Sequence, residues 1–357
     1  MVDLVLNELR GESGWCVEHL EFRFTPSFSS VRRANFSKVC ELLKVYLRLF
    51  RIILRHGRVD LVIYPSGGPQ TVPVLRDILL LPIVRPATRR LLIQFHAAGI
   101  AERLKQKHGF LERLLKNAYT SVDGAIVMTD FNRSDPEALG ISKVEVIPHQ
   151  LKDENPEGRL PDYSLQPLRI LYAGHLYGQK GTPQLIEAFA RVARDRPGLR
   201  CLLMGEFLPP YSWPICEARC REMGIADLVE WVGVRHGAEK NRIFADAGLF
   251  VFPSVAPYES FGLVMVEAMM WGLPIVATDW RGNRDVVGSV AEYCETGERM
   301  VESMAAALEK ILVSRDMLQE RASASRSRFE RFFCKRPGCK PYIDLVKRVL
   351  SSGGNGK

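Results

Sequence analysis

The chain has 357 residues, of which 46% are hydrophobic and 25% are charged, with a formal net charge of +8 at pH 7. This is a globular composition, long enough for two domains with separate cores, and the basic balance suits nucleotide diphosphates, anionic lipid or nucleic acid without choosing between them. No signal peptide opens the chain and no apolar run is long enough to span a bilayer, which excludes an integral membrane protein. We expect a cytoplasmic protein that is soluble or bound at the inner face of the membrane.

The eight cysteines lack the paired spacing of a zinc site. Cys216 and Cys220 lie four positions apart in an expected helix, and Cys334 and Cys339 flank a Pro-Gly pair. Neither pair has a histidine in finger-like register. Free thiols in a reducing cytosol are therefore the favoured interpretation, and we expect no metal site.

The first half of the chain alternates apolar strands with amphipathic helices. Residues 16–24 predict a strand, and residues 36–56 predict a helix with apolar positions at helical spacing. Because strands that alternate with helices form a parallel sheet covered on both faces, this half predicts an α/β domain. Further strands are expected at 59–64, 90–95, 123–128 and 143–147.

A polar, proline-rich segment at 152–167 has almost nothing to bury and is the best candidate for a linker. The alternation that follows is cleaner. Strands are expected at 168–173, 199–205, 228–232, 248–252 and 273–277, with helices at 182–195, 213–223, 238–246, 261–271 and 300–330. We predict an α/β protein of two Rossmann-like domains, residues 1–155 and 165–335, which face a cleft and bind ligands at the carboxyl ends of strands.

The segment 257–287 carries the strongest candidate site. Glu259 and Glu267 lie eight positions apart, with Gly262 between them at the start of an expected helix. The backbone N–H groups of 260–263 would form a helix N-terminus, which favours phosphate or a developing anion. Glu267 is placed to accept hydrogen bonds from vicinal hydroxyls such as those of a ribose. For the two carboxylates taken alone, a helix cap at Glu259 and a solvated Glu267 are the alternative.

The whole segment resembles the nucleotide-sugar site of the family 4 retaining glycosyltransferases, whose signature is a Glu, seven residues and a second Glu. Glu259 and Glu267 form that signature here, and GLPIVATDWRGNRDVV downstream is similar to the family's GxPVVAT run. Three other stretches match in order and spacing. They are the diphosphate loop YAGHLYGQKG at 172–181 and the base-lining strand ends at 202–206 and 230–254.

The resemblance covers roughly residues 168–330 and implies a B-type fold, with residues 336–357 as a C-terminal helix returning toward the N-terminal domain. Lys180 would place its ammonium against the β-phosphate, Glu267 would hold the ribose and Glu259 would contact the donor sugar. His175 replaces the family's arginine; it is shorter and mostly neutral near pH 7, so one phosphate contact is expected to be weaker. The implied donor-binding residues are Gly174, His175, Lys180, Gly205, Glu259, Ser260, Phe261, Gly262, Leu263 and Glu267, and the implied catalytic residues are His96, Lys180 and Glu259.

The match is thinner in the first half. IQFHAAG at 93–99 is similar to the family strand whose terminal histidine faces the transferred sugar, which implies this role for His96; a satisfied histidine at a strand end is the alternative. Relatives open with a strand and a Gly-Gly loop, whereas residues 4–22 read as the helix after that loop running into the next strand. The N-terminal domain therefore lacks a counterpart of the first strand and loop, through a truncated start or through natural loss.

The helix 36–56 carries Lys38, Lys44, Arg48, Arg51 and Arg55 beside its apolar positions. Such a helix can lie on an anionic membrane surface, and a core helix with a solvated basic face is the alternative. Nucleic acid is not expected as a partner, because no basic motif is interleaved with aromatic residues.

The resemblance implies a retaining, metal-independent hexosyltransferase of polysaccharide biosynthesis, without a cofactor. It would move a sugar from a nucleotide-diphosphate donor to a glycan or lipid-linked acceptor. Two alternatives stay open: an enzyme of the same architecture with other chemistry, such as a sugar-nucleotide epimerase or a phosphorylase, and an inactive or truncated relative that still binds nucleotide sugar. The missing Gly-Gly loop and His175 favour the second.

Overall fold

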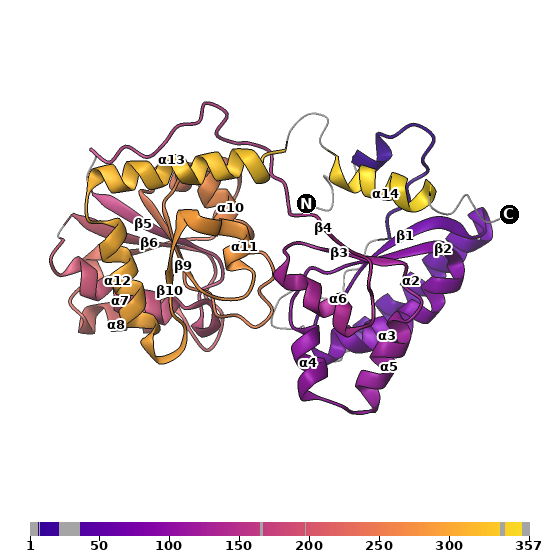
Figure 1. Ribbon diagram of the computed structural model, residues 1–357. Coiled ribbons are helices and arrows are strands. Elements are labelled where there is room, and N and C mark those ends of the chain that lie inside the picture. The colour runs from indigo at the N-terminus through magenta and orange to yellow at the C-terminus, as the bar shows by residue number, and fades with distance from the viewer. Residues whose placement is uncertain are drawn as a thin grey trace. The chain divides into compact units, whose positions relative to one another are not determined.

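The structure is a computed structural model that describes residues 6, 8–20, 36–164, 167–196, 198–335 and 340–351, with side chains in the first long helix described from residue 44 onward. The chain forms two compact units. Unit 1 comprises Met1–Ile147 and Pro337–Lys357, and unit 2 comprises Pro148–Arg336. Each contains one parallel sheet with helices packed on it (Figure 1).

Unit 1 has a four-stranded parallel sheet in the order β1-β2-β3-β4. Its strands are short apolar runs whose buried side chains form one core with the surrounding helices. The elements are α2 (Phe36–His56), β1 (Val59–Pro65), α3 (Thr71–Ala87), β2 (Thr88–Gln94), α4 (Ile100–Gln106), α5 (Phe110–Tyr119), β3 (Gly124–Val127), α6 (Ser134–Ala138), β4 (Val144–Val146) and α14 (Pro341–Ser351).

The predicted helix 36–56 and the four predicted strands that follow it are confirmed. The strand predicted at 16–24 is wrong for residues 16–20, which pair with no strand; residues 21–24 lie outside the described part of the chain. A strand needs a neighbour for its backbone N–H and C=O groups, and alternation in sequence does not supply one. No strand precedes β1 within residues 8–20 and 36–58.

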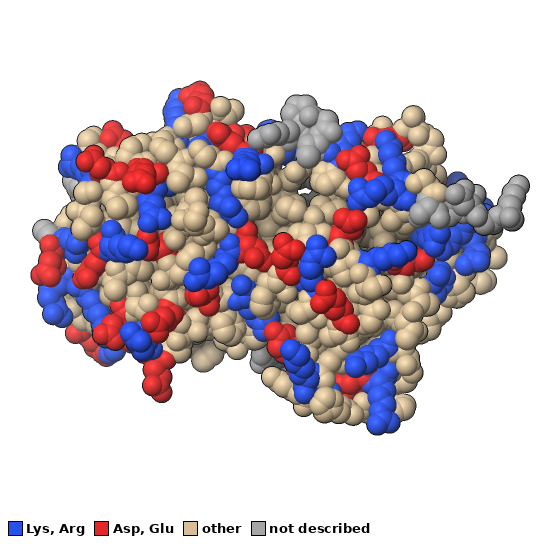
Figure 2. Space-filling model, in the orientation of Figure 1, with Lys and Arg blue, Asp and Glu red and all other residues tan. Residues whose placement is uncertain are grey.

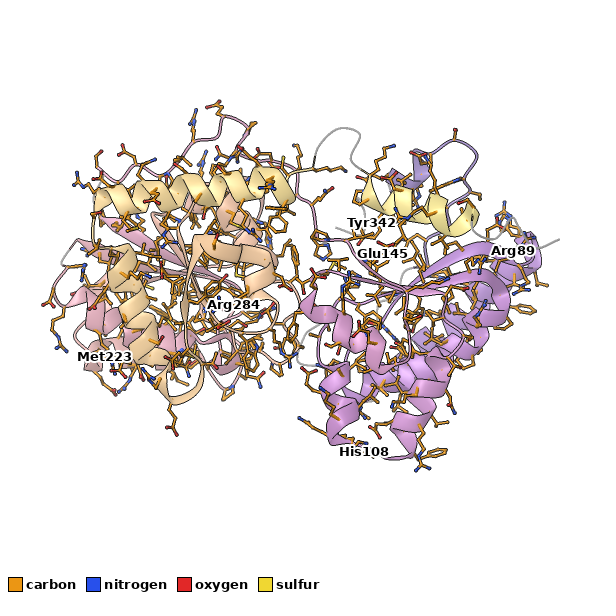
Figure 3. The ribbon with its side chains drawn as sticks, viewed as in Figure 1. Arg89, His108, Glu145, Met223, Arg284 and Tyr342 are labelled. Carbon is orange, nitrogen blue, oxygen red and sulfur yellow. The ribbon has the colours of Figure 1, made fainter. Side chains whose placement is uncertain are left out.

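The C-terminal helix α14 packs on the sheet of unit 1. Tyr342 and Leu345 are buried in a small cluster with Leu92 of β2 and other sheet residues. Gln94 Nε2 lies 2.5 Å from the Tyr342 hydroxyl. Figure 3 labels Tyr342 on α14 beside Glu145 of β4, whose carboxylate accepts a hydrogen bond of 3.1 Å from Arg348. The last helix therefore completes a face of the first sheet.

Unit 2 has a six-stranded parallel sheet in the order β10-β9-β8-β5-β6-β7. All five predicted strands are confirmed, and β10, α11 and the division of 300–330 into two helices are additions. The elements are β5 (Leu168–Ala173), α7 (Thr182–Ala193), β6 (Leu199–Met204), α8 (Trp213–Glu222), β7 (Val229–Gly233), α9 (Gly237–Ala245), β8 (Leu249–Phe252), α10 (Leu263–Met270), β9 (Ile275–Thr278), α11 (Asn283–Val287), β10 (Ala291–Cys294), α12 (Met300–Ile311) and α13 (Arg315–Phe332).

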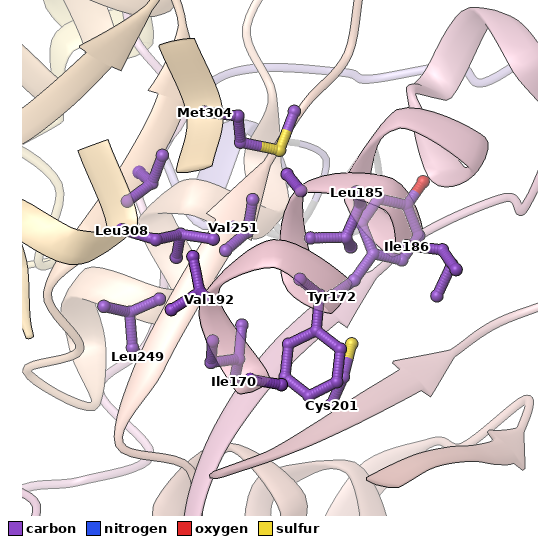
Figure 4. Packing of buried hydrophobic residues seen from close by; sticks show 14 of the residues in the cluster. Ile170, Tyr172, Leu185, Ile186, Val192, Cys201, Leu249, Val251, Met304 and Leu308 are labelled. Carbon is purple, nitrogen blue, oxygen red and sulfur yellow. The ribbon is translucent and has the colours of Figure 1, made fainter. Parts of the chain in front are cut away.

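The core of unit 2 lies between the sheet and helices α7, α8 and α12. Figure 4 shows its centre, where Ile170 and Tyr172 of β5 meet Leu185 of α7 and Leu308 of α12. These side chains are almost completely buried. The central strand β5 pairs with β6 on one side and β8 on the other and is covered by this core. The loop that follows its carboxyl end is therefore anchored to a closely packed strand.

The interpretation of 152–167 as a linker is wrong for its described part. Asn155 is 3% exposed and donates hydrogen bonds from Nδ2 to the carbonyls of Arg159 and Met270. Asp153 pairs with Arg326 of α13 at 2.5 Å. The segment belongs to unit 2, and Asp153 and Asn155 attach it there through their contacts with α13 and Met270.

Candidate functional site

The strand order of unit 2 creates a crevice at the carboxyl edge of its sheet. From β5 the chain moves outward to β6 and β7, returns to β8 on the other side of β5, and continues outward to β9 and β10. The loops after β5 and β8 therefore start side by side and run in opposite directions. Ligands of open α/β sheets bind at such a switch point. The two loops that flank it, residues 174–181 and 253–262, lie in or overlap the predicted diphosphate loop 172–181 and the predicted donor segment 257–287.

The loop after β5 is held closely against the end of β8. The carbonyl of Gln179 accepts a hydrogen bond of 2.9 Å from Val255 N–H. Gly181 has a φ of +72°, and a Cβ at this position would lie 2.0 Å from the Pro253 carbonyl oxygen. Glycine is therefore required directly before α7, and it fixes Lys180 over the crevice.

Lys180 and Glu259 meet across the crevice. Lys180 Nζ lies 2.5 Å from Glu259 Oε2, and the side chains are 15% and 12% exposed. The same carboxylate oxygen accepts a hydrogen bond of 2.9 Å from the Ser254 hydroxyl. Two predicted catalytic residues from loops 79 positions apart are thus brought together, and the pair places an ammonium where an anionic ligand would approach.

Helix α10 begins at Leu263, two residues later than predicted. Gly262 has a φ of +61°, and this left-handed conformation ends the preceding loop before the helix can start. Ser260 is buried, and Phe261 is buried with its ring 5.1 Å from that of His149 and 5.9 Å from that of Phe333. Any contact of Phe261 with a ligand would therefore come from its backbone.

Glu267 lies on α10 and is held by a lysine of a neighbouring helix. Lys240 of α9 donates from Nζ to Glu267 Oε1 at 2.7 Å, and the carboxylate side chain is 17% exposed. The alternative interpretation, in which Glu267 is a solvated residue on the helix surface, does not fit this geometry. A fixed, mostly buried carboxylate of this kind can accept hydrogen bonds from a pair of ligand hydroxyls.

Replacing Glu267 with alanine is expected to weaken nucleotide-sugar binding by about 1–3 kcal/mol, because a charged hydrogen-bond acceptor is removed. Isothermal titration calorimetry measures the change. Glu217→Ala, which breaks a surface ion pair with Arg221 on α8, is the matched control and should bind like the unmodified protein. Equal affinities in both variants would remove Glu267 from the site.

Gly174 and Gly205 form the floor between the ends of β5 and β6. Gly174 N–H donates to the Met204 carbonyl at 2.9 Å, and a Cβ on Gly205 would lie 1.8 Å from the Gly174 carbonyl oxygen. Both glycines have φ values above +140°. Side chains are excluded here, so the backbone itself is left to face a ligand.

His175 lies in the loop after β5, and its pKa is below the usual value, chiefly because burial disfavours the charged imidazolium. The Lys180 ammonium lowers that pKa further, while the Glu206 carboxylate opposes the change. The imidazole is therefore neutral at pH 7. Because the folded state holds this proton less tightly than the unfolded state, His175 makes the fold less stable as the pH falls below about 6.5.

Donor affinity is expected to rise about three- to tenfold as the pH falls from neutrality through the lowered pKa of His175, because protonation gives the imidazole a charged hydrogen bond to the diphosphate. Calorimetry across this range measures the slope. His175→Ala should flatten it, and His108→Ala, in the α4–α5 connection of unit 1 (Figure 3), should leave it unchanged. A pH-independent affinity would exclude the contact.

His96 lies in unit 1, two residues after the carboxyl end of β2. Part of the residue faces solvent, yet the surrounding protein desolvates the imidazole and lowers its pKa. The loop after β1 lies beside it, since a Cβ on Gly68 would be 3.1 Å from Ala97 Cβ. The role of His96 toward the transferred sugar stays a prediction.

Three residues at the crevice were not predicted from the sequence: Ser254, Lys240 and Arg281. Ser254 lies two residues after the end of β8, and its position near a strand end was the available signal. Lys240 is brought to Glu267 only by the packing of α9. Arg281 follows β9 with a φ of +48°, a conformation that costs a non-glycine residue about 1–2 kcal/mol and that clusters at functional sites.

No group of three or more His, Cys, Asp or Glu side chains in the described ranges is arranged to hold a metal ion. Within the same ranges, each helix is too short or too polar to cross a membrane.

Comparison with known proteins agrees with the location of the crevice. Residues 167–314 match the model of the family described as glycosyl transferases group 1. The chain is 24% identical over 241 residues to the uncharacterized glycosyltransferase YqgM of Bacillus subtilis, covering 68% of this chain and 65% of that protein. It is 32% identical over 162 residues to a glycogen synthase of Mycobacterium tuberculosis, covering 45% of this chain and 38% of the relative. The aligned part is thus less than two thirds of the length of either relative.

Solved structures match over more of the chain. Sucrose-phosphate synthase of Thermosynechococcus elongatus superposes with a TM-score of 0.69 at 19% identity, covering 95% of this chain and 86% of that one. HepE of Anabaena, solved in complex with UDP, superposes with a TM-score of 0.65 at 18% identity, covering 87% and 82%. At these identities the likeness shows the fold, which is the two-sheet α/β fold of B-type glycosyltransferases. The segment 167–314, which carries the crevice, is thus similar to the glycosyl transferases group 1 family.

Proposed function

We propose that the chain is a glycosyltransferase that takes a sugar from a nucleotide-diphosphate donor bound in the crevice of unit 2. The observation that carries the proposal is the Lys180–Glu259 pair, 2.5 Å apart at the switch point of the sheet, inside the segment that matches the glycosyltransferase family. The UDP in the HepE structure and the glycosyltransferase names of the curated relatives support a donor of this class.

In this proposal each crevice residue has a distinct task. Lys180 exchanges its partner Glu259 for the donor diphosphate and neutralises the charge that develops on the departing nucleotide. Glu259, released from the lysine but still bonded to Ser254, accepts hydrogen bonds from hydroxyls of the donor sugar. Glu267, oriented by Lys240, holds the ribose. No carboxylate attacks the sugar, so the two-carboxylate scheme of glycosidases does not apply.

The proposal also includes the finer features that the family resemblance implies. Transfer retains the anomeric configuration and needs no metal, because Lys180 and the start of α10 supply the positive potential. The acceptor is a glycan or a lipid-linked sugar that meets the donor through unit 1, where His96 contacts the transferred hexose. The reaction belongs to polysaccharide biosynthesis at the cytoplasmic side of the membrane.

Thermal stabilisation by a panel of UDP-, GDP- and ADP-sugars identifies the donor, because a ligand that binds only the folded state raises the Tm. The sugar nucleotide that gives the largest rise is then incubated with the protein and a mixture of glycan and lipid-linked acceptors. Release of nucleoside diphosphate that depends on acceptor, persists in EDTA and yields a product with the donor's anomeric configuration is the expected result.

The same incubation distinguishes the alternative functions. An epimerase would convert the sugar nucleotide into a second one without acceptor, which NMR spectroscopy of the donor alone detects. A relative that binds but does not catalyse would show the Tm rise without release of nucleoside diphosphate. Absence of any Tm rise across the panel would contradict the proposed donor class itself.

A further inference from the structure

Helix α2 exposes a row of apolar side chains on the side that faces away from the core of unit 1. Leu47, Phe50 and Leu54 are 59%, 57% and 70% exposed, and they recur at positions i, i+3 and i+7 of the helix. The side chains that join the core, Val45 and Leu49, occupy the opposite face. Tyr46 and Ile53, which lie between the two sets around the helix, are partly buried against the same core, so the apolar surface of α2 continues from the core to solvent.

Helix α3 exposes a similar row. Leu75, Leu79 and Ile83 recur four positions apart and are 42%, 49% and 42% exposed. Pro82 and Pro86 are also exposed, whereas no charged residue of this helix is. A solvent-facing helix surface of a soluble protein ordinarily carries charged or polar residues, so an entirely apolar one indicates something that covers it.

The two rows lie on neighbouring helices. The Tyr46 hydroxyl of α2 donates a hydrogen bond of 3.1 Å to the Leu79 carbonyl of α3, and Figure 1 shows the two helices side by side in unit 1. Together the rows form what we call the α2–α3 face, made of Leu47, Phe50, Leu54, Leu75, Leu79, Pro82, Ile83 and Pro86.

A basic row flanks the α2–α3 face. Lys44, Arg48, Arg51 and Arg55 are all exposed and lie at successive turns of α2, and no acidic residue occurs between positions 44 and 56. On the face of unit 2 that Figure 2 shows, by contrast, the two signs of charge are mixed. Basic side chains beside an exposed apolar face are complementary to a surface whose outer layer is negatively charged and whose inner layer is apolar.

A pocket lies at the C-terminal end of α3. Its volume is about 380 Å³, and Pro82 and Pro86 of the α2–α3 face share its lining with Arg58 and Arg85. Arg85 is 3.7 Å from the Asp123 carboxylate, while Arg58 has no carboxylate partner among the described residues. Since α3 ends where β2 begins, the pocket lies at the amino end of β2, opposite to His96.

We propose that the α2–α3 face docks the protein on an anionic phospholipid bilayer. The apolar side chains enter the boundary between headgroups and acyl chains, the basic row of α2 pairs with lipid phosphates, and the Arg58 pocket takes one headgroup phosphate. A second copy of the chain is disfavoured as occupant, because two such faces in contact would bring two basic rows together. The proposal does not depend on the donor crevice, which lies in unit 2.

Vesicle co-sedimentation without any sugar nucleotide tests the proposal. The unmodified protein is expected to bind phosphatidylcholine vesicles that contain phosphatidylglycerol, to bind pure phosphatidylcholine at least tenfold more weakly, and to be released by salt. Phe50→Ser is expected to reduce the partition coefficient about tenfold, and removal of one base by Arg51→Gln or Arg58→Gln about fivefold.

Matched controls distinguish vesicle binding through the α2–α3 face from nonspecific binding through other exposed apolar or basic residues. Phe110→Ser removes a phenylalanine that is 76% exposed at the start of α5, and Arg194→Gln removes an exposed base of unit 2; both should bind vesicles like the unmodified protein. Far-ultraviolet circular dichroism checks that each variant is folded. Equal loss in Phe50→Ser and Phe110→Ser, or no loss in Phe50→Ser, would overturn the proposal.

Sedimentation velocity on the same samples tests the other occupant. A concentration-dependent dimer that Phe50→Ser abolishes, together with no binding to anionic vesicles, would assign the α2–α3 face to a second copy of the chain and would also overturn the proposal. A donor-induced rise in Tm is measured separately, so failure of membrane docking and failure of donor binding cannot be confused.

Discussion

Replacement of Lys180 by alanine is expected to weaken donor binding by about 1–3 kcal/mol, which corresponds to roughly a 5- to 150-fold rise in Kd. The ammonium is the cation that the described structure places in the crevice at 2.5 Å from Glu259. Without it, the carboxylate, 12% exposed, keeps Ser254 as its hydrogen-bond partner and repels the donor diphosphate. The lost attraction between Lys180 and the diphosphate and the new repulsion by Glu259 both weaken donor binding.

Calorimetric titration of Lys180→Ala measures this effect, and a surface lysine provides its control. Lys310→Ala also breaks an ion pair, at 2.7 Å to Glu292, but on a side chain that is 65% exposed. Its donor affinity should equal that of the unmodified protein. If Lys180→Ala bound the donor normally and lost only stability, the Lys180–Glu259 pair would be a structural ion pair and not part of a diphosphate site.

Replacement of Gly181 by alanine is expected to destabilise unit 2 by about 3 kcal/mol or more and to lower its Tm by roughly 6–12 °C. Two costs add. The φ of +72° disfavours any residue with a Cβ, and the new Cβ would lie 2.0 Å from the Pro253 carbonyl oxygen, a distance at which the backbone must move. That movement separates the loop after β5 from the loop after β8.

Gly178 offers a control within the same loop. A Cβ at this position would have no neighbour within 4 Å, and its φ is not in the left-handed region. Gly178→Ala should therefore leave the Tm within about 2 °C of the unmodified value. Thermal unfolding followed by circular dichroism compares the two. Similar Tm values for both variants would show that the loop does not depend on the close approach of Gly181 to Pro253.

The described strands other than β10 were predictable because each is a short apolar run between turn residues, and burial on both faces of a parallel sheet demands such runs. The family resemblance implied that Lys180 and Glu259 serve one donor site, but their ion pair was not predicted. The two residues are 79 positions apart in the sequence, and they meet because β8 lies beside β5 in the sheet. The sequences of the individual strands do not reveal this strand order.

Other features depended on contacts that leave no pattern in sequence. The segment around Asn155 has a linker's composition, yet its polar groups find partners on α13 and at Met270. Helix α10 begins at Leu263 instead of the predicted residue 261, because Gly262 adopts a left-handed conformation. The amphipathic character of α2 was predictable, but the exposed apolar row of α3 was not, since its two prolines and buried Asp77 obscure the helical period.

Hydrogen–deuterium exchange shows whether a nucleotide-sugar donor binds in the crevice of unit 2, because it locates a bound donor along the chain. The sugar nucleotide that raises the Tm most is added at saturation, and exchange is followed by mass spectrometry. We expect slower exchange in the peptides that cover 174–181 and 253–263, which contain the two loops that flank the switch point of unit 2. Protection confined to other segments, with these two loops unchanged, would contradict this expectation.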